Sequence, residues 1–380
     1  MSVWDDLVGQ EEAISRFRTA ASDSRALAHS WLITGPPGSG RSNLAYAFAS
    51  ALLCRSGGCG ECPDCRQVAA RTHPDLSALA TERVIISIDE VRALVTTAQF
   101  GPRVAKYRVV VIEDADRMVE RTSNVLLKAL EEPPEGTIWI LCAPSEADLL
   151  PTIRSRVRSV RLTVPSINDV ANLIVGRTGV AYEVAERAAR HAQSHVGMAT
   201  RLCTNDLAAA RRDETVRRAL SVKNVRDAVF VAARLLEIAT EDAKALTEEK
   251  DALEVEETRR AFGLAVEDSI PAGMRATFRS LEEQQKRRET RSLRDGLDRI
   301  LVDLSSVFRD VLLLQLGVRD GIINVEYLSD LEPFAAALTA RTALDVTDAI
   351  MTARHRIAGN VSPVLALEAM MIVSTPRVAA

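Results

Sequence analysis

The sequence has few aromatic residues and no surplus of positive charge. Aromatic residues make up 4% of the 380-residue chain, and its formal net charge is −4. A protein that holds nucleic acid by itself usually carries a basic surplus, often with aromatic rings on which bases stack. We therefore expect any contact with DNA to be local or shared with partner proteins.

Long apolar runs are also missing from the sequence. No stretch approaches the roughly 20 residues that a membrane-spanning helix requires. The N-terminal segment lacks the basic and then apolar profile of a secretory signal. With 47% hydrophobic and 26% charged residues, the composition is that of a soluble globular protein. We expect a cytoplasmic protein of two or three domains, because 380 residues are too many for one compact core.

The first part of the chain alternates between strand-like and helix-like segments. Short apolar runs predict strands at residues 30–34, 108–112 and 137–142. Helical spacing is found at residues 43–53 and 124–130. This alternation predicts a parallel sheet with helices on its faces.

Strand signals become sparse after Pro165. Helices are expected at residues 169–176 and 182–195, with Gly197 as a helix stop, and the chain reads as helical from about residue 206.

Two stretches of this helical half have distinctive residue patterns, one apolar and one acidic. Residues 297–311 carry apolar side chains at three- and four-residue steps, which predicts a helix face packed against a core. Residues 237–260 are charged and mainly acidic, which indicates a solvated helix face or a mobile insertion.

Residues 35–42 (GPPGSGRS) fit a phosphate-binding loop, except that Arg41 stands where the pattern has lysine. The loop follows a predicted strand and opens a predicted helix, and Ser42 is placed to bind Mg²⁺. A planar guanidinium is a poor substitute for the compact ammonium that reaches the β- and γ-phosphates. The site is therefore either a weakened ATP site or a relic loop that only completes the fold. Backbone N–H groups can turn toward a phosphate at three glycines: Gly35, Gly38 and Gly40.

The acidic pair after the predicted strand at 108–112 departs from a hydrolytic site as well. Such a site needs an aspartate for Mg²⁺ followed by a glutamate that orients water. Here the order is Glu113 and then Asp114, which is one methylene shorter than the glutamate expected there. Together with Arg41, this reversal predicts no independent ATPase activity, although the residues still outline a degenerate nucleotide site.

Four of the six cysteines lie within twelve residues, at C-x₄-C-x₂-C-x₂-C spacing. Four thiolates close a tetrahedral shell around Zn²⁺ without an open position, so we expect structural zinc in a module at residues 54–65. The alternative is a cluster of reduced thiols without metal. The other two cysteines, Cys142 and Cys203, are expected in the core. The predicted ligands are Cys54, Cys59, Cys62 and Cys65.

Several motifs, taken in order, resemble one family, the AAA+ clamp loaders of bacterial DNA polymerase III. Residues 124–134 (NVLLKALEEPP) are close to a family hallmark, and residues 151–157 (PTIRSRV) resemble its Ser-Arg-Cys motif with valine for cysteine. Residues 72–75 (THPD) and 88–92 (IDEVR) are typical of the delta-prime branch. The other similar segments are residues 6–10 (DLVGQ), 29–32 (HSWL) and 360–368 (NVSPVLALE).

The resemblance implies three domains and a multisubunit assembly. An α/β RecA-like AAA+ domain at 1–163 would carry the zinc-knuckle insertion, followed by a small helical lid at 164–205 and an all-α collar at 206–380. The implied partners are the gamma/tau and delta subunits in a hetero-pentamer. The sliding clamp and primer-template DNA would be contacted through that assembly.

The resemblance also gives a role to Arg156, which follows Ser155 in the Ser-Arg motif. An arginine supplied across a subunit interface stabilises charge on the transferring phosphoryl group and is worth roughly 10³–10⁵ in rate. Arg156 is thus expected to be an arginine finger for a neighbour. The alternatives are an ordinary surface arginine or a contact to DNA phosphates.

Three functions follow from these patterns. The first is a non-catalytic clamp-loader subunit that completes a neighbour's ATP site. The second is an active AAA+ motor subunit of the same loader, which would require the missing lysine and an Asp-Glu pair. The third is a DNA-binding zinc module unrelated to replication, which would require the basic surplus and aromatics that the sequence lacks.

Overall fold

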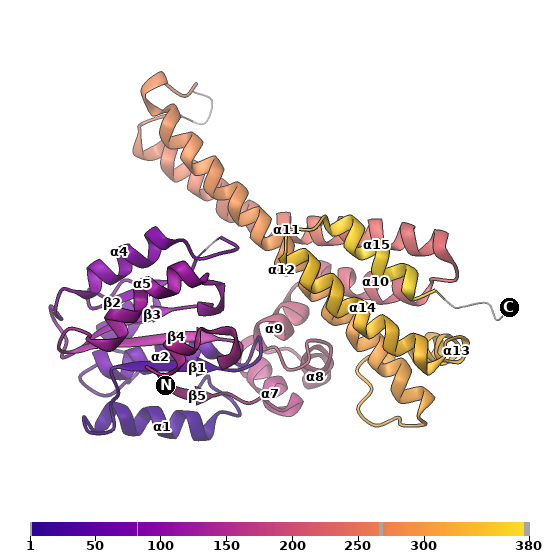
Figure 1. The fold of residues 1–380 in the computed structure, drawn as a ribbon, viewed down its shortest axis with the longest axis horizontal. Helices are drawn as coiled ribbons and strands as arrows, with labels where there is room; N and C mark the ends of the chain where they lie inside the picture. The colour runs from indigo at the N-terminus through magenta and orange to yellow at the C-terminus, as the bar shows by residue number, and fades with distance from the viewer. Residues whose placement is uncertain (1, 82, 266–268, 376–380) are drawn as a thin grey trace. The chain divides into compact units, whose positions relative to one another are not determined.

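The computed structural model describes residues 2–81, 83–265 and 269–375. The chain divides into two compact units, Met1–Thr204 and Asn205–Ala380 (Figure 1). Among the described residues, none of the helices has the length and apolar character needed to cross a membrane.

The first unit contains a parallel sheet of five strands in the order β2-β3-β4-β1-β5. Its three central strands were predicted within one residue, and all their residues are buried. The two edge strands were not predicted, because each is short and half exposed and so lacks an apolar run. The strands are β1 (Ser30–Thr34), β2 (Leu76–Leu79), β3 (Arg108–Ile112), β4 (Thr137–Ala143) and β5 (Arg158–Arg161).

Helices cover both faces of this sheet, and Figure 1 shows α1 on the side opposite to α4 and α5. Alternate side chains of β1 explain the two layers, since successive residues of a strand point to opposite faces. Trp31 and Ile33 pack with α1 and α2, whereas Leu32 packs with α4 and α5. The helices are α1 (Glu11–Ser22), α2 (Arg41–Leu53), α3 (Pro63–Ala69), α4 (Ile88–Ala98), α5 (Glu120–Glu131) and α6 (Pro151–Arg154).

Three short helices complete the first unit and form a small alanine-rich core of their own. They are α7 (Ile167–Thr178), α8 (Tyr182–His191) and α9 (Val196–Thr204). The expectation of a helix stop at Gly197 was wrong, because this glycine lies in the first turn of α9. The chain turns before it, where Gln193 and Ser194 both adopt left-handed backbone conformations.

The second unit is helical throughout its described regular elements, as the sequence predicts. The predicted apolar face at 297–311 is buried in its core. Gly296 permits a close helix crossing, since an added Cβ would lie 3.3 Å from the Ala239 carbonyl oxygen. The helices are α10 (Asp206–Leu220), α11 (Val225–Ala261), α12 (Arg275–Gln315), α13 (Leu328–Ala337), α14 (Ala340–Ala358) and α15 (Pro363–Val373).

The acidic stretch at 237–260 lies within α11, one of two long helices that run antiparallel beyond the bundle as an arm (Figure 1). Arg288 of α12 pairs with Asp251 and donates to Glu254 over 2.8 Å. Near the base of the arm, Arg299 pairs with Asp242 at 3.1 Å. The stretch is therefore a charged helix face whose carboxylates are partly neutralised by arginines of the partner helix.

Candidate functional site

The predicted phosphate loop joins the buried strand β1 to helix α2. Gly38 and Gly40 have φ angles of 81° and 92°, the left-handed region that favours glycine. Helix α2 begins at Arg41, and its N-cap Gly40 offers no side chain to cap the first turn. The hydroxyl oxygen of Ser39 is buried in this loop without a hydrogen-bond partner. An uncapped helix N-terminus behind a glycine loop suits an anion such as phosphate.

Arg41 does not extend into open space above the loop. Its guanidinium donates to the carbonyl oxygen of Gly35, at the start of the same loop. The guanidinium is thus engaged by a backbone carbonyl of the loop itself.

The acidic pair after β3 is divided between two networks. Glu113 accepts a hydrogen bond from Ser42 Oγ at 2.6 Å, so the structure brings these two predicted residues together. Asp114 instead adopts a left-handed φ of 49° and pairs with Arg117 at 3.4 Å. Glu113, the residue in the metal-binding position, is therefore the one that faces the phosphate loop.

Two further side chains hold Glu113, and neither was predicted from the sequence. Tyr46 donates its hydroxyl to Glu113 Oε1 over 2.8 Å, and Arg71 Nη2 lies 3.0 Å from the same oxygen. Burial and the charge of Glu113 raise the pKa of Tyr46, which keeps the phenol protonated. Tyr46 could have been found from its place one helical turn after Ser42. Arg71 is distant in sequence, and no local signal marks it.

The phosphate loop also contacts the turn before α9. A Cβ added at Gly38 would lie 2.2 Å from His195 Cγ, so the imidazole packs directly on this glycine. His195 Nδ1 accepts a hydrogen bond from the Met198 backbone N–H at 3.2 Å, which fixes the ring orientation. The sequence did not indicate this contact, because it joins segments far apart in the chain.

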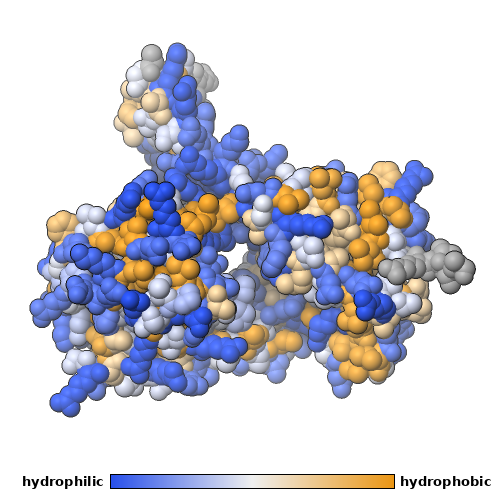
Figure 2. Space-filling model, in the orientation of Figure 1, coloured by the Kyte–Doolittle hydropathy of each residue, from blue (hydrophilic) through white to orange (hydrophobic). Residues whose placement is uncertain are grey.

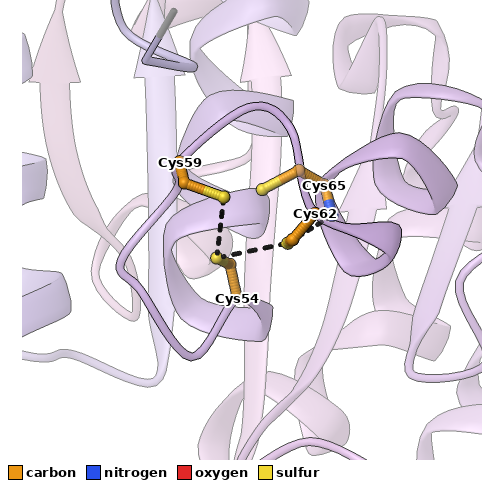
Figure 3. Close-up of side chains that lie close together, drawn as sticks. All are labelled: Cys54, Cys59, Cys62 and Cys65. Atoms are coloured by element: carbon orange, nitrogen blue, oxygen red, sulfur yellow. Dashed lines mark hydrogen bonds between the residues drawn. The ribbon is translucent and has the colours of Figure 1, made fainter.

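The four clustered cysteines converge in space (Figure 3). Their sulfur atoms all lie within 4.8 Å of one another, and Cys54 Sγ lies 3.8 Å from Cys59 Sγ and 3.5 Å from Cys62 Sγ. Sulfurs bound to one tetrahedral zinc at about 2.3 Å lie about 3.8 Å apart. The arrangement therefore fits a four-thiolate zinc shell.

Backbone N–H groups donate to two of these sulfurs and favour the thiolate form at Cys54, whereas burial raises the pKa of Cys65 despite its donor. Gly60 donates to Cys65 Sγ at 3.3 Å, and Ser56 donates to Cys54 Sγ at 3.3 Å. Burial alone would raise the pKa of Cys54, but the N–H donors outweigh it and lower the pKa to about 6. The other two cysteines lie elsewhere, Cys142 fully buried in β4 and Cys203 half-buried in α9.

The segment that carries the four clustered cysteines is joined to the sheet through the residue-72–75 motif. His73 is buried, with Nε2 3.8 Å from Asp64 of α3 and Nδ1 accepting from the Asp75 N–H. The fully buried Asp75 carboxylate accepts hydrogen bonds from the N–H groups of residues 103, 104 and 105 at 2.6–2.8 Å. This motif therefore fixes the loop that leads into β3.

Arg156 lies between α6 and β5 and is about one-third exposed. Its Nε donates to Glu131 Oε1 at 2.7 Å, and its Nη1 donates to the Thr152 carbonyl oxygen at 2.7 Å. The Nη1 atom also donates to Ser155 Oγ at 3.1 Å. Arg156 is thus held at the surface by its own chain, and Ser155 supports it.

The first unit combines a phosphate loop, an acidic pair that follows β3 and three short helices beside a parallel sheet, an arrangement that fits an AAA+ domain, and a helical C-terminal region follows it. Residues 9–166 match the profile of a family described as DNA polymerase III, delta subunit. The DNA polymerase III delta-prime subunit of Pseudomonas aeruginosa is 43% identical over 139 residues, 34% of this chain and 41% of that protein. The similarity to DNA polymerase III clamp-loader subunits, delta-prime among them, thus lies in the N-terminal region of the chain.

Two other similar proteins complete the comparison. The tau/gamma subunit of Haemophilus influenzae is 33% identical over 156 residues, 40% of this chain and 22% of that protein. The solved structure of a DNA polymerase III gamma subunit-related protein of Thermotoga maritima has a TM-score of 0.46 at 18% identity, covering 97% of this chain and 99% of that one. The chain spans about two-fifths of the delta-prime relative, at 41%, and a smaller share of tau/gamma.

Proposed function

We propose that this chain is a non-catalytic clamp-loader subunit that helps to place the sliding clamp on primed DNA. In the proposed assembly it joins gamma/tau and delta subunits in a hetero-pentamer, contacts primer-template DNA only through that assembly, and supplies Arg156 to a neighbour's ATP. The proposal divides the chain into an AAA+ domain at 1–163, a lid at 164–205 and a collar at 206–380. Structural Zn²⁺ on the four cysteines stabilises the AAA+ domain.

The observation that carries this proposal is the contrast between two arginines of the chain, Arg41 and Arg156. Arg41, in the phosphate loop, is turned to the Gly35 carbonyl, whereas Arg156 lies at the surface with part of its guanidinium exposed. An AAA+ protein that has lost the catalytic cation of its own site but retains a surface arginine after a Ser-Arg motif is suited to act on a neighbour's nucleotide. The delta-prime likeness of residues 9–166 favours the same assignment.

The test is the DNA-stimulated ATPase rate of a loader reconstituted with its motor subunits, delta, clamp and primed DNA. Arg156→Ala is expected to slow hydrolysis at the neighbouring site by about 10³-fold, because the transition-state charge loses its counter-ion. Arg156→Lys is expected to restore little, since a lysine lacks the planar fork of the guanidinium. Arg154→Ala, an exposed arginine two residues away, is the matched control and should leave the rate unchanged.

The alternative function, an active motor subunit of the same loader, is tested with the chain alone. It predicts ATP turnover by the isolated protein at a rate comparable to gamma/tau. Our proposal predicts no turnover above the background of an Arg41→Ala variant. Turnover by the wild-type chain at a motor-like rate, together with an Arg156→Ala loader of normal activity, would establish the motor function.

A further inference from the structure

Both carboxylate oxygens of Glu113 are engaged by side chains of the same chain. Oε1 accepts from Tyr46 and pairs with Arg71, while Oε2 accepts from Ser42. The Glu113 side chain is only 14% exposed, so the group is largely withdrawn from water. A buried carboxylate requires a cation or several donors, and here it has both.

Arg71 is the cation in this network, and a second contact orients its half-exposed side chain. Its guanidinium carbon lies 4.8 Å from the centre of the Tyr46 ring, so the arginine stacks on the tyrosine that also binds Glu113. The three side chains form one closed unit, in which Arg71 contacts both the ring face and the carboxylate. An arginine held by two partners at once loses little further entropy when it pairs.

The backbone at Arg71 supports the same conclusion. Arg71 follows α3 and adopts a left-handed φ of 60°, in a position where helix termini favour glycine. Its N–H donates to the Val68 carbonyl at 3.0 Å, and the Thr72 N–H donates to the Gln67 carbonyl at 2.8 Å, which closes the helix end. An arginine at a site suited to glycine indicates that the side chain is needed there.

Magnesium does not fit this arrangement, although the loop itself suits a phosphate. In a P-loop protein the Ser42 and Glu113 positions serve Mg²⁺, which demands nearly ideal octahedral oxygen ligands. Arg71 already supplies positive charge to Glu113, and Tyr46 blocks part of the same oxygen. A second cation at Oε1 would meet the guanidinium directly, and one at Oε2 would bind a carboxylate whose charge Arg71 already neutralises.

We propose that Arg71 takes the place of the divalent cation in this site. The acidic residue of the phosphate-loop site is neutralised by a resident arginine carried on the end of the zinc-module helix. The site therefore does not recruit Mg²⁺, and its acidic network is a structural contact between the zinc module, α2 and β3. This inference does not depend on the proposed clamp-loader function.

The test is Mn²⁺ binding to the purified full chain, measured by water-proton relaxation. Mn²⁺ prefers oxygen ligands as Mg²⁺ does, and the thiolate cluster favours softer metals. The Arg71→Asn variant removes the charge with a residue that tolerates the left-handed backbone. We expect it to bind Mn²⁺ at least about tenfold more tightly than the wild type, a difference of about 1.4 kcal/mol.

Three controls assign the signal to Glu113. The double variant Arg71→Asn/Glu113→Gln should lose the gained binding, and Arg71→Lys should bind as weakly as the wild type. Arg92→Asn, which removes an exposed arginine of α4, should change nothing. Equal Mn²⁺ binding by wild type and Arg71→Asn, whether strong or absent, would overturn the proposal.

A second measurement does not depend on the affinity assay. The midpoint of thermal unfolding should rise on addition of Mn²⁺ for Arg71→Asn and not for the wild type, because a ligand that binds only the folded state stabilises it. If Arg71→Asn fails to fold, Arg71→Gly provides the same comparison with a relaxed backbone. A wild-type midpoint that rises as much as the variant's would contradict the assignment.

Discussion

Arg156 and Glu131 form an ion pair at the surface, with Arg156 Nε donating to Glu131 Oε1 at 2.7 Å. Glu131 ends helix α5 within the residue-124–134 motif, and Arg156 belongs to the Ser-Arg motif, so two sequence motifs meet in one contact. An arginine acting on a neighbour's nucleotide must leave this partner. The pair is 32% and 46% exposed, and such pairs contribute only about 0–1 kcal/mol.

Glu131→Gln is therefore expected to change the free energy of unfolding of the isolated chain by less than about 1 kcal/mol. In the reconstituted loader it should leave the ATPase rate equal to or above that of wild type, because Arg156 is released more easily. The measurements are urea denaturation and DNA-stimulated ATPase, with Glu132→Gln as control. A loss as severe as that of Arg156→Ala would show instead that Glu131 positions the arginine during hydrolysis.

The cysteine cluster predicts one zinc ion per chain, measurable by metal analysis of protein purified without added metal. Cys62→Ala should abolish this zinc and lower the free energy of unfolding by on the order of a few kcal/mol, because metal binding to a folded site adds to stability. Cys203→Ala, a half-buried cysteine outside the cluster, should retain the full zinc content. Zinc that persists in Cys62→Ala would place the metal elsewhere.

Asp75→Asn is expected to destabilise the first unit by about 2–4 kcal/mol, because three backbone N–H donors lose a charged acceptor. Burial alone would raise the pKa of Asp75, but the donors and Arg108 outweigh it and hold the pKa below its usual range. A carboxyl with a lowered folded-state pKa stabilises the protein above its unfolded-state pKa of about 3.9.

That stabilisation is lost as the pH falls through the lower pKa of the folded state. The difference in unfolding free energy between wild type and Asp75→Asn should therefore be constant near neutral pH and shrink below about pH 4. Urea denaturation across this pH range provides the measurement. A difference that stays constant into acid would mean that the carboxylate charge contributes nothing.

The arm formed by α11 and α12 should be dispensable for folding of the second unit. The buried core of this unit draws on residues 228–239 of the first long helix and on residues from 297 onward of the second, so the arm lies outside it. Arg288 pairs with Asp251 and Arg299 with Asp242, so residues 247 and 293 lie roughly opposite one another.

Replacing residues 248–292 by a short turn should retain cooperative unfolding, with the helical circular dichroism reduced only by the residues removed. A matched variant that keeps the arm but carries Arg288→Ala should also unfold cooperatively. A shortened chain with no unfolding transition would show that the arm contributes to the fold of the bundle.

The strands and the cysteine cluster show what local sequence patterns are able to predict. Strands β1, β3 and β4 are buried on both faces, and their unbroken apolar runs identify them. The edge strands β2 and β5 have exposed positions and lack such runs. Four of the cysteines lie within twelve residues, so their spacing alone predicts that they lie together. The convergence of their sulfur atoms confirms that expectation.

The contacts of Glu113 show what local sequence patterns do not predict, namely contacts between residues that are distant in the sequence. Ser42 and Glu113 were both assigned from the sequence to the degenerate nucleotide site, and in the structure Ser42 donates a hydrogen bond to Glu113. Arg71 was not predicted, because its contact depends on how helix α3 ends and on where β3 passes. The same is true of His195 on Gly38 and of Glu131 on Arg156.

Residue type and short-range spacing were enough to predict the parallel sheet of the first unit, the cluster of four cysteines and the departures of Arg41 and Glu113 from the phosphate-site motifs. These properties depend on groups that are neighbours along the chain, whose geometry the backbone constrains directly. Which cation neutralises Glu113, and which carboxylate holds Arg156, depended on packing between distant segments. Such contacts form only when the whole sheet and its helices bury their apolar faces, so no local pattern encodes them.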